Sequence, residues 1–524
     1  MAANEGDLRS ALERRFKGDR SGVCIAAAVI ENGTIAKTYY CSDPKSGRSI
    51  DGRTAFEIGS VTKTMVAALL ADLVGQGEIA LDDTLEKLLP PATVVPCFNG
   101  SPITVRHLVA HTSGLSSFPW RITDFGNPYA RLTETDLLDA LSETQLNRAP
   151  GSLREYSNFA FMVLSYALAK HSGKDFETLL RERLLSPLDM GDTFIVRRPP
   201  TVRLAEGHFS NSKPTGPWEV QVDLAGAGGV RATLPDMVCY LEGQLGMRDT
   251  PITPILARTQ EQIGEAAGMA WEILFTEDGR TIVMHPGGTG GFSTFFAIDR
   301  ATRSGVVLLS DTALTEIGGL RRVGLHLLDP SLPIGTPRTM ATAKVELIDA
   351  LVGRYSLPFG LDMELRRKSN KLTIQADDQP EFEMEYDSAG EFYPLEFDAV
   401  LQPRRQVDGS YTFTWYQLGG IQKAKRVETS VPAALIQALN ETQLKEYEGK
   451  YILSRTLALR VFVSGPKVII QSTGQAPQEV TPFDKDVFVI EPLGAEIAFE
   501  RNADGRVIAL TLNQRGQILR GERH

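Results

Sequence analysis

An internal repeat constrains the last third of this chain more than any other feature. Four short matches share one offset of 96 residues: Gly353-Arg-Tyr355 with Gly449-Lys-Tyr451, Leu372-Thr-Ile-Gln375 with Val468-Ile-Ile-Gln471, Asp408-Gly409 with Asp504-Gly505, and Gly420 with Gly516. One shared dipeptide means little, but four matches in one register indicate two copies of a unit. Short alternating strands with turn signals dominate residues 346–524, and each copy has room for eight. We therefore expect two antiparallel, lipocalin-like eight-stranded β-barrels, at residues 345–425 and 440–524.

The part of the chain before the repeat has the pattern of a mixed α and β domain. A chain of 524 residues is too long for one core, and the Pro-rich stretch 329–337 is typical of a linker. Strands are expected in a hairpin at residues 23–41 and again at residues 268–275, 281–285, 292–299 and 305–311. Helices are expected at residues 1–18, 60–75, 133–146, 158–171, 235–245 and 313–328. Strands at both ends of a segment with helices between them predict an α+β domain over residues 1–330, an antiparallel sheet flanked by helices.

The charge and the hydropathy pattern argue against several partners. A net charge of −10 does not favour nucleic acid or an anionic membrane surface. No apolar run reaches the roughly 18 residues of a membrane span. The first residues lack the basic and apolar regions of a signal peptide. We therefore expect no nucleic-acid or membrane partner and a cytoplasmic location, or a periplasmic one if a leader has been removed.

The four cysteines are too few for a disulfide framework. An Asn32-Gly33 turn in the hairpin at residues 23–41 places Cys24 opposite Cys41. This leaves a disulfide open as an alternative. Two half-buried thiols are the favoured interpretation, because nothing in the sequence indicates an oxidising compartment.

Ser60 and Lys63 stand three residues apart where an apolar helix pattern begins. Residues i and i+3 share one face of a helix, so the hydroxyl and the amine are within reach of each other. They form a nucleophile with a neighbouring base if burial or nearby charge lowers the pKa of the lysine. The helix N-terminus also favours developing negative charge. Alone, however, Ser-x-x-Lys is a chance pattern typical of a solvated helix start.

Two further stretches supply candidate catalytic groups. Tyr156-Ser157-Asn158 opens a helix pattern after Pro150-Gly151. A tyrosine there shuttles protons if cations lower its pKa, and Asn158 is placed to hold the lysine and a substrate carbonyl. Taken singly, these two residues are more simply a packed tyrosine and a helix cap.

The other stretch is His285-Pro-Gly-Gly-Thr-Gly-Gly291, between two expected strands. Its glycines allow the backbone to approach a ligand closely. The plain alternative is a tight hairpin turn with an incidental histidine.

In this order and spacing, the three elements resemble the motifs of the serine β-lactamase and penicillin-binding protein superfamily. The resemblance is closest to class C β-lactamases and the related esterases and D-peptidases, and it covers about residues 20–328. Supporting matches lie at residues 108–115, 187–190, 227–230 and 305–309. The resemblance implies that Ser60 is acylated and that Lys63 and Tyr156 share proton transfer. It also implies a substrate site beside Asn158 and Gly287, with the backbone N–H groups of Ser60 and Gly288 as the oxyanion hole.

The third motif departs from the common pattern of that family. Most of its β-lactamases and transpeptidases carry Lys-Thr-Gly where this chain carries His285-Pro-Gly287. A neutral imidazole attracts a substrate carboxylate far less than an ammonium does. His-x-Gly is similar to the D-aminopeptidase, D-amino-acid amidase and esterase branches, and the three-domain D-aminopeptidase also carries two eight-stranded barrels. In that enzyme a loop of the last barrel brings an aspartate to the substrate amine. The corresponding stretch here, about residues 473–483, is short, with Glu479 as its only acid.

No metal or cofactor site is expected. His107 and His111 have the i, i+4 spacing of a zinc pair, but no glutamate follows His107. The segment instead matches a structural stretch of the resembled family. The glycines of residues 225–229 are not followed by the Gly-Lys-Ser/Thr of a phosphate loop.

These observations predict a serine peptidase or amidase that acts on short, unusual peptides, with D-residues or of non-ribosomal origin. Lys63 is the expected first base for Ser60, and Tyr156 relays the proton to the leaving group. Tyr156 and His285 are the candidates for activating or orienting the deacylating water. A carboxylesterase with the same residues and a catalytically silent binding protein stay open as alternatives. The oligomeric state is also open, although the barrels offer surfaces for a homo-oligomer.

Overall fold

The computed structural model divides the chain into two units, Met1–Thr339 and Met340–His524, which are described separately below. The residues that it describes are 4–119, 127–264, 267–276, 279–358, 361–377, 379–406, 410–417, 420–427, 441–453, 458–465, 467–472, 477–484, 486–490, 495–502, 504–514 and 517–524. The predicted domain limits at 330, 345, 425 and 440 stay a prediction, and residues 428–440 lie outside the described part of the chain.

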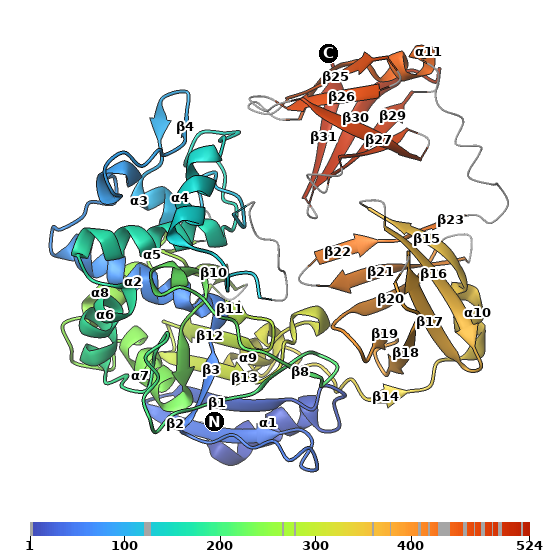
Figure 1. Ribbon diagram of the computed structural model, residues 1–524. Helices are drawn as coiled ribbons and strands as arrows, with labels where there is room; N and C mark the ends of the chain where they lie inside the picture. The colour runs from blue at the N-terminus through green and yellow to red at the C-terminus, as the bar shows by residue number, and fades with distance from the viewer. Residues whose placement is uncertain are drawn as a thin grey trace. The chain divides into compact units, whose positions relative to one another are not determined.

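The first unit is built on an antiparallel six-stranded sheet with the order β10-β11-β12-β13-β1-β2 (Figure 1). The strands are β1 Cys24–Glu31, β2 Thr34–Cys41, β10 Glu272–Phe275, β11 Thr281–Gly288, β12 Ser293–Asp299 and β13 Ser304–Ser310. The first two strands of the chain, β1 and β2, form one side of the sheet. The last four strands of the unit, β10 to β13, form the rest of it. This is the arrangement expected from strands at both ends of a segment with helices between them.

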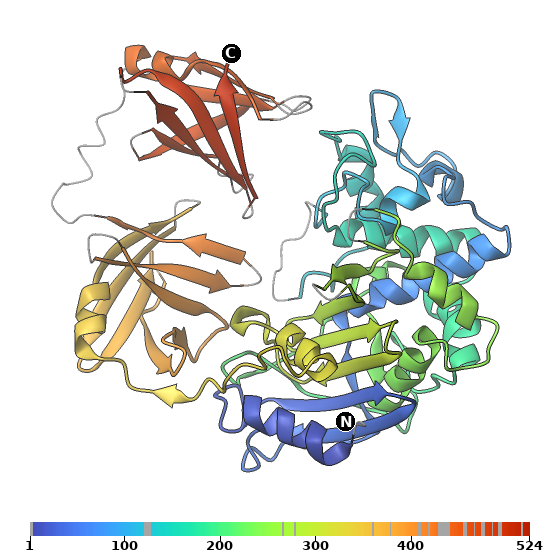
Figure 2. The ribbon, with the colours of Figure 1, turned by 180° about the vertical axis from the view of Figure 1, so that it is seen from behind.

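Helices cover both faces of this sheet. Figure 2 shows α1 and α9 on the near side, where α1 contacts β2 and α9 contacts β12 and β13. Helix α7 packs on the opposite face against β1 and β13, beside a helical region in which α2 contacts α5 and α8. The α-helices of this unit are α1 Glu5–Phe16, α2 Thr62–Gly75, α3 Val105–Val109, α4 Glu134–Glu143, α5 Asn158–Ser172, α6 Phe176–Leu180, α7 Leu234–Gln244, α8 Thr253–Thr259 and α9 Arg321–Leu328.

Short elements connect the helical region to the sheet. A three-stranded sheet has the order β6-β3-β9, and β3 ends just before the Ser60 turn. The short strands are β3 Thr54–Glu57, β4 Cys97–Phe98, β5 Ser101–Pro102, β6 Arg203–Leu204, β7 Gly207–His208, β8 Pro214–Thr215 and β9 Arg231–Thr233. Shorter 3₁₀ or π-helical segments are η1 Gly59–Val61, η2 Leu85–Leu88, η3 Arg181–Leu185, η4 Ser186–Leu188, η5 Val222–Ala227 and η6 Thr315–Ile317.

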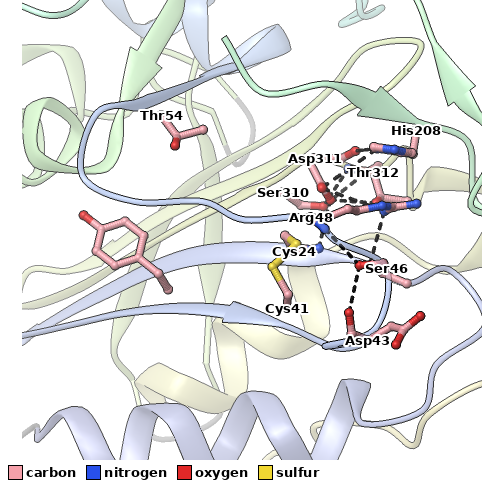
Figure 3. Close-up of a disulfide and its surroundings, with 12 residues drawn as sticks. Cys24, Cys41, Asp43, Ser46, Arg48, Thr54, His208, Ser310, Asp311 and Thr312 are labelled. Carbon is pink, nitrogen blue, oxygen red and sulfur yellow. Dashed lines mark hydrogen bonds and ion pairs between the residues drawn. A yellow bond between two sulfur atoms is a disulfide. The ribbon is translucent and has the colours of Figure 1, made fainter. Parts of the chain in front are cut away.

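The first hairpin has the register expected from its turn, but the expectation of two free thiols is wrong. Asn32 and Gly33 both have positive φ, 51° and 78°, which is the conformation of the tight turn that Asn-Gly favours. Cys24 pairs with Cys41, and the two form a disulfide with a Cα–Cα distance of 4.0 Å (Figure 3). Ser42 N donates to Val23 O, so the neighbouring Cys24–Cys41 pair is a non-hydrogen-bonded one, in which side chains come closest. The hairpin geometry favours the bond, although the sequence contains no signal for an oxidising compartment.

Two other expectations need correction. The helix expected at residues 313–328 is interrupted: η6 ends before Gly318 and Gly319, both with positive φ, and only α9 continues. Two adjacent residues in the left-handed region end any right-handed helix. The strand expected at residues 268–275 begins only at Glu272, because Gly268 N donates to Trp271 O in a tight turn.

The second unit contains two antiparallel barrels, as the repeat predicted. In the first, the strands run in the order β22-β21-β20-β19-β18-β17-β16-β15-β23. Because only Ala424 separates β22 from β23, one extended segment borders both edges and nearly closes the ring. Its strands are β15 Gly353–Leu357, β16 Leu361–Lys368, β17 Lys371–Ala376, β18 Phe382–Asp387, β19 Phe392–Pro394, β20 Val400–Arg405, β21 Tyr411–Gln417, β22 Gly420–Lys423 and β23 Lys425–Val427, preceded by β14 Met340–Ala341 and α10 Val345–Leu351.

The second barrel is closed by eight consecutive strands. They are β24 Gly449–Ile452, β25 Ala458–Ser464, β26 Lys467–Ser472, β27 Gln478–Asp484, β28 Val487–Ile490, β29 Ala495–Arg501, β30 Val507–Gln514 and β31 Gln517–Arg523, after α11 Glu441–Leu444 and η7 Lys445–Tyr447.

The repeated tyrosines occupy equivalent positions in the two barrels. Tyr355 and Tyr451 are both fully buried, and each hydroxyl donates 2.8 Å to the backbone carbonyl four residues earlier. Each tyrosine also pairs with an arginine of the closing strand, Arg426 and Arg523 respectively. Of the other matches, residues 408–409 and 516 lie outside the described part of the chain. Among the helices that the structure describes, none combines the length and apolarity that a bilayer crossing requires.

Candidate active site

Ser60 lies in the turn η1, directly before α2, and Lys63 follows it in the first turn of that helix. Lys63 Nζ lies 3.0 Å from Ser60 Oγ, as the i, i+3 spacing predicts. The lysine is fully buried. Burial lowers the pKa of its amine well below the ordinary value, which favours the neutral base.

The other two hydrogen bonds of Lys63 leave only the lone pair of a neutral Nζ for Ser60. Nζ donates to Asn158 Oδ1 over 2.7 Å and also donates to the carbonyl oxygen of Ala227. Both partners only accept, so both of these contacts require protons on Nζ. A neutral amine has two protons and one lone pair. With both protons engaged, the lone pair is left to accept the proton of Ser60.

Tyr156 approaches Ser60 from the start of α5. Its hydroxyl donates to Ser60 Oγ over 2.6 Å. Burial raises the pKa of this phenol, and the hydrogen bond with Ser60 offsets only part of that effect. The condition set by the sequence interpretation, a pKa lowered by cations, is therefore not met. Tyr156 stays protonated at neutral pH and acts as a donor.

The start of α5 is fixed by side-chain and backbone hydrogen bonds to residues 116–117. Ser157 caps the helix by accepting from Ala160 N, and its hydroxyl donates 2.7 Å to Ser116 O. Asn158 N donates 2.9 Å to Ser117 O. A cap residue with bonds on both sides fixes the helix start, and hence the direction of the Asn158 side chain toward Lys63.

His285 lies on β11, and its imidazole is neutral. Nδ1 is 2.6 Å from the carbonyl oxygen of Pro286, which only accepts, so Nδ1 carries the proton. Burial is the main reason that the pKa of His285 is lowered to about 3. Its ring centroid lies 6.3 Å from that of Tyr156. Nε2 therefore offers a lone pair, but one of low basicity.

The end of β11 packs directly against the Ser60 turn, backbone to backbone. A Cβ on Gly287 would lie 2.2 Å from Ile58 O, and one on Gly59 would lie 2.6 Å from Gly288 N. Gly59 also has a φ of 51°, so glycine is required at this junction for both reasons.

The register directs the N–H of Gly288 away from the sheet. Thr289 N donates to Phe292 O, so the neighbouring pair, Gly288 with Ser293, is a non-hydrogen-bonded one. Its N–H therefore points away from β12, on the side where the Ser60 turn lies.

The structure thus brings together all the residues predicted from the sequence: Ser60, Lys63, Tyr156, Asn158, His285, Gly287 and Gly288.

A narrow hollow of about 10 Å³, room for about one water molecule, adjoins this cluster. Its walls include Ala227 and Gly228, which contact Lys63 and Gly59, together with the aromatic rings of Tyr129 and Trp218. Glu57 and Arg231 form a buried ion pair at 3.2 Å on another side. The hollow is mostly apolar and too small for more than about one water molecule.

Two contacts at the site were not found by sequence reasoning. The Ala227 carbonyl belongs to a stretch matched to the resembled family, but a backbone oxygen gives no residue-type signal. His111, expected to be structural, stacks on the Tyr156 ring with centroids 4.5 Å apart. Nothing in the described part of the chain groups three or more side chains of the types that hold a metal ion.

Comparison with known proteins agrees with this geometry. The Beta-lactamase family model matches residues 9–323. The chain belongs to the Beta-lactamase family. It is 31% identical to the D-alanyl-D-alanine-carboxypeptidase/endopeptidase AmpH of Escherichia coli, over 53% of this chain and 77% of that protein. It is 27% identical to Esterase EstB of Burkholderia gladioli, over 60% of this chain and 91% of the esterase.

A solved structure extends the comparison to the fold. The D-alanine carboxypeptidase AmpC of Burkholderia cenocepacia is 26% identical, with a TM-score of 0.52 over 62% of this chain and 99% of that one. This member of the Beta-lactamase family is therefore a serine hydrolase of the β-lactamase, carboxypeptidase and esterase type. The family match ends before the barrels begin.

Proposed function

We propose that this chain is a peptidase or amidase that hydrolyses short peptides through an acyl-enzyme on Ser60. The observation that carries the proposal is the convergence of two proton carriers on one oxygen. Lys63 Nζ and Tyr156 OH lie 3.0 Å and 2.6 Å from Ser60 Oγ. A serine with both a base and a donor on its oxygen is arranged as an activated nucleophile.

Acylation begins when neutral Lys63 takes the hydroxyl proton of Ser60 and Oγ attacks the substrate carbonyl carbon. The N–H groups of Ser60 and Gly288 stabilise the tetrahedral oxyanion. Tyr156, which stays protonated, gives its proton to the leaving nitrogen as the C–N bond breaks, and Lys63 restores it. General acid–base steps of this kind contribute about 10²–10⁴-fold in rate, and an oxyanion donor contributes a similar factor.

Deacylation needs a water molecule positioned at the ester carbonyl. A histidine with a pKa of about 3 is a weak base at neutral pH, so His285 Nε2 serves to orient the water by accepting a hydrogen bond. Tyr156 and Lys63 then carry the proton in the reverse direction, and the ester bond to Oγ breaks.

The neutral state of His285 supports a substrate whose leaving group needs no strong carboxylate partner on β11. We therefore propose short peptides, including D-alanyl peptides, as the substrates. AmpH, by its name, cleaves such D-alanyl bonds, and that similarity supports the D-configuration.

Recognition of a substrate amine through Glu479 has little support. Glu479 lies on β27 and accepts 2.7 Å from Lys467 Nζ, so its charge already has a partner. Residues 473–476 of the corresponding loop lie outside the described part of the chain.

The disulfide supports a location different from the cytoplasm expected from the sequence. Disulfides persist in oxidising compartments and are rare in the cytosol. The Cys24–Cys41 bond therefore favours the periplasmic alternative.

A carboxylesterase is the second candidate, supported by the similarity to EstB and by the neutral His285. The two candidates differ in the leaving group. The test compares turnover of D-alanine p-nitroanilide, a D-alanyl dipeptide and p-nitrophenyl acetate, with Ser60→Ala as the control for each. A peptidase cleaves the two amides with kcat/KM above the Ser60→Ala background; turnover of the ester alone would identify an esterase.

Labelling with a fluorophosphonate separates both enzymes from a silent binding protein. The proposal expects one covalent adduct, on Ser60, located by peptide mass spectrometry and absent in folded Ser60→Ala. No adduct under conditions that label a control serine hydrolase would overturn every enzymatic version.

A further inference from the structure

His111 makes contacts to both chain neighbours of Tyr156 and to its ring. His111 O accepts from Glu155 N over 2.8 Å, and His111 Nδ1 accepts from Ser157 N over 3.1 Å. Its imidazole stacks on the phenol with a centroid distance of 4.5 Å and an interplanar angle of 29°. One residue thus fixes the backbone on each side of the tyrosine and the plane of its ring.

The backbone of His111 is held in an unusual conformation. Its φ is 59°, in the left-handed region that non-glycine residues rarely adopt. His111 follows the short helix α3, whose residue His107 closes a capping box with Thr104. Such strain persists only where surrounding contacts determine it, and it is concentrated at functional sites. Here the strained residue is the one that contacts the tyrosine.

The tautomer of His111 is determined by its neighbour. Because Ser157 N–H donates to Nδ1, that nitrogen is unprotonated and the ring proton is on Nε2. His111 is 2% exposed, and its ring centroid lies 4.8 Å from that of Phe161. A second proton would displace the Ser157 contact and add a cation close to Lys63.

We propose that His111 is a positioning residue that holds Tyr156 at hydrogen-bond distance from Ser60 and thereby sets the rate of proton transfer. The inference rests on the proposed function only in that it needs Tyr156 to carry a proton. The contacts to Tyr156 stand independently of the substrate.

Two substitutions separate the contacts of His111. His111→Asn keeps a short acceptor and tolerates positive φ, but it removes the stacked ring. His111→Phe keeps a ring and removes the acceptor for Ser157 N. His107→Gln is the matched control, because glutamine preserves the capping box and the residue does not contact Tyr156. We expect about 10–100-fold lower kcat in each His111 variant, with KM changed less than about twofold and His107→Gln near wild type.

A double-mutant cycle distinguishes positioning from a general loss of stability. In a Tyr156→Phe background, His111→Asn should cause less than about a twofold further loss, because the group that it positions is gone. An equal loss in both backgrounds, or an unchanged kcat in His111→Asn alone, would overturn the inference. Thermal unfolding of all variants verifies that each is folded at the assay temperature.

A spectroscopic measurement keeps the inference testable even if no substrate is turned over. In protein labelled with 13C at the tyrosine ζ carbon, the Tyr156 resonance is assigned by its absence in Tyr156→Phe. A looser, wetter phenol ionises at lower pH, so we expect this resonance to titrate earlier in both His111 variants than in wild type or His107→Gln. An unchanged titration would overturn the positioning role, whereas absence of Ser60 labelling would overturn only the proposed function.

Discussion

Oδ1 of Asn158 accepts a hydrogen bond from Nζ of Lys63 over 2.7 Å, and this contact bears directly on the protonation of the lysine. The amide oxygen is uncharged, so it accepts the hydrogen bond without favouring the ammonium as strongly as a carboxylate would. Together with the Ala227 carbonyl, it occupies two protons and leaves the lone pair for Ser60. The absence of charge on the Asn158 side chain thus helps to keep Lys63 in its neutral, basic form.

Asn158→Asp should therefore lower activity at neutral pH through charge alone. A carboxylate at this distance raises the pKa of a buried amine by about 1–3 units. We expect the ascending limb of the pH profile of kcat/KM to move to higher pH by that amount, with at least tenfold lower activity at pH 7. Asn158→Ala removes the acceptor without adding charge and should not move the limb upward. An unmoved limb in folded Asn158→Asp would contradict the assignment of Lys63 as the base.

Tyr156→Phe tests the donor directly. Loss of the hydroxyl removes the proton for the leaving nitrogen, and kcat for an amide should fall by about 10²–10⁴. The matched control is Tyr166→Phe, a tyrosine of the same helix whose hydroxyl bonds to Glu134 outside the site. Steady-state kinetics on D-alanine p-nitroanilide measure the difference. Equal losses in both variants would indicate a general effect on α5.

His285→Lys examines the departure from the common third motif. An ammonium on β11 adds attraction for a carboxylate that the neutral imidazole lacks. The second-order rate of acylation by a labelled penicillin should rise by about tenfold or more, while turnover of an uncharged ester rises less. His285→Gln, also neutral, should give no such gain. If the lysine and glutamine variants acylate equally, the charge of residue 285 does not select the substrate.

Much of this fold follows from local sequence signals, because these signals and the tertiary structure agree. The Asn32-Gly33 turn determined the register of the first hairpin, and Ser157 determined the start of α5. The barrels were predicted from a repeat because equivalent residues make the same contacts in both copies. Tyr355 and Tyr451, for example, each donate a hydrogen bond to the backbone carbonyl four residues earlier.

The unpredicted features depend on groups that residue types do not reveal. The third partner of Lys63 is a backbone carbonyl, which any residue could provide. The Tyr156 pKa depends on how much water reaches the hydroxyl, and this requires the packed structure. The break at Gly318 and Gly319 was not predicted, because the apolar pattern typical of a helix continues through the segments on both sides of it. The Cys24–Cys41 bond depends on cellular redox conditions as well as on geometry.

Two of the buried histidines, His111 and His285, make stability depend on pH. Burial lowers the pKa of both His111 and His285 below the value of about 6.5 in an unfolded chain. Below that pH the unfolded state binds more protons, so the free energy of unfolding falls as the pH falls. Each group contributes up to about 1.4 kcal/mol per pH unit, and for His285 the loss continues toward pH 3. Urea unfolding of wild type and His285→Gln between pH 6.5 and 4 measures the slope. The variant should show the shallower dependence, and equal slopes would contradict a neutral buried His285.

The disulfide should stabilise the catalytic unit without taking part in its chemistry. The bonded cysteines are 17 residues apart, and a loop of that size is stabilised by about 3 kcal/mol on the chain-entropy account. In the sheet, β2 lies at one edge, and β12, β13 and β1 separate it from β11. We therefore expect the double variant Cys24→Ala/Cys41→Ala to lose about 2–4 kcal/mol of unfolding free energy while keeping kcat/KM within about twofold at 25 °C. Cys97→Ala, at an exposed free thiol, is the matched control and should change neither quantity. A fall in kcat/KM well beyond twofold in the folded double variant would show that the hairpin and the Ser60 turn are coupled through the sheet.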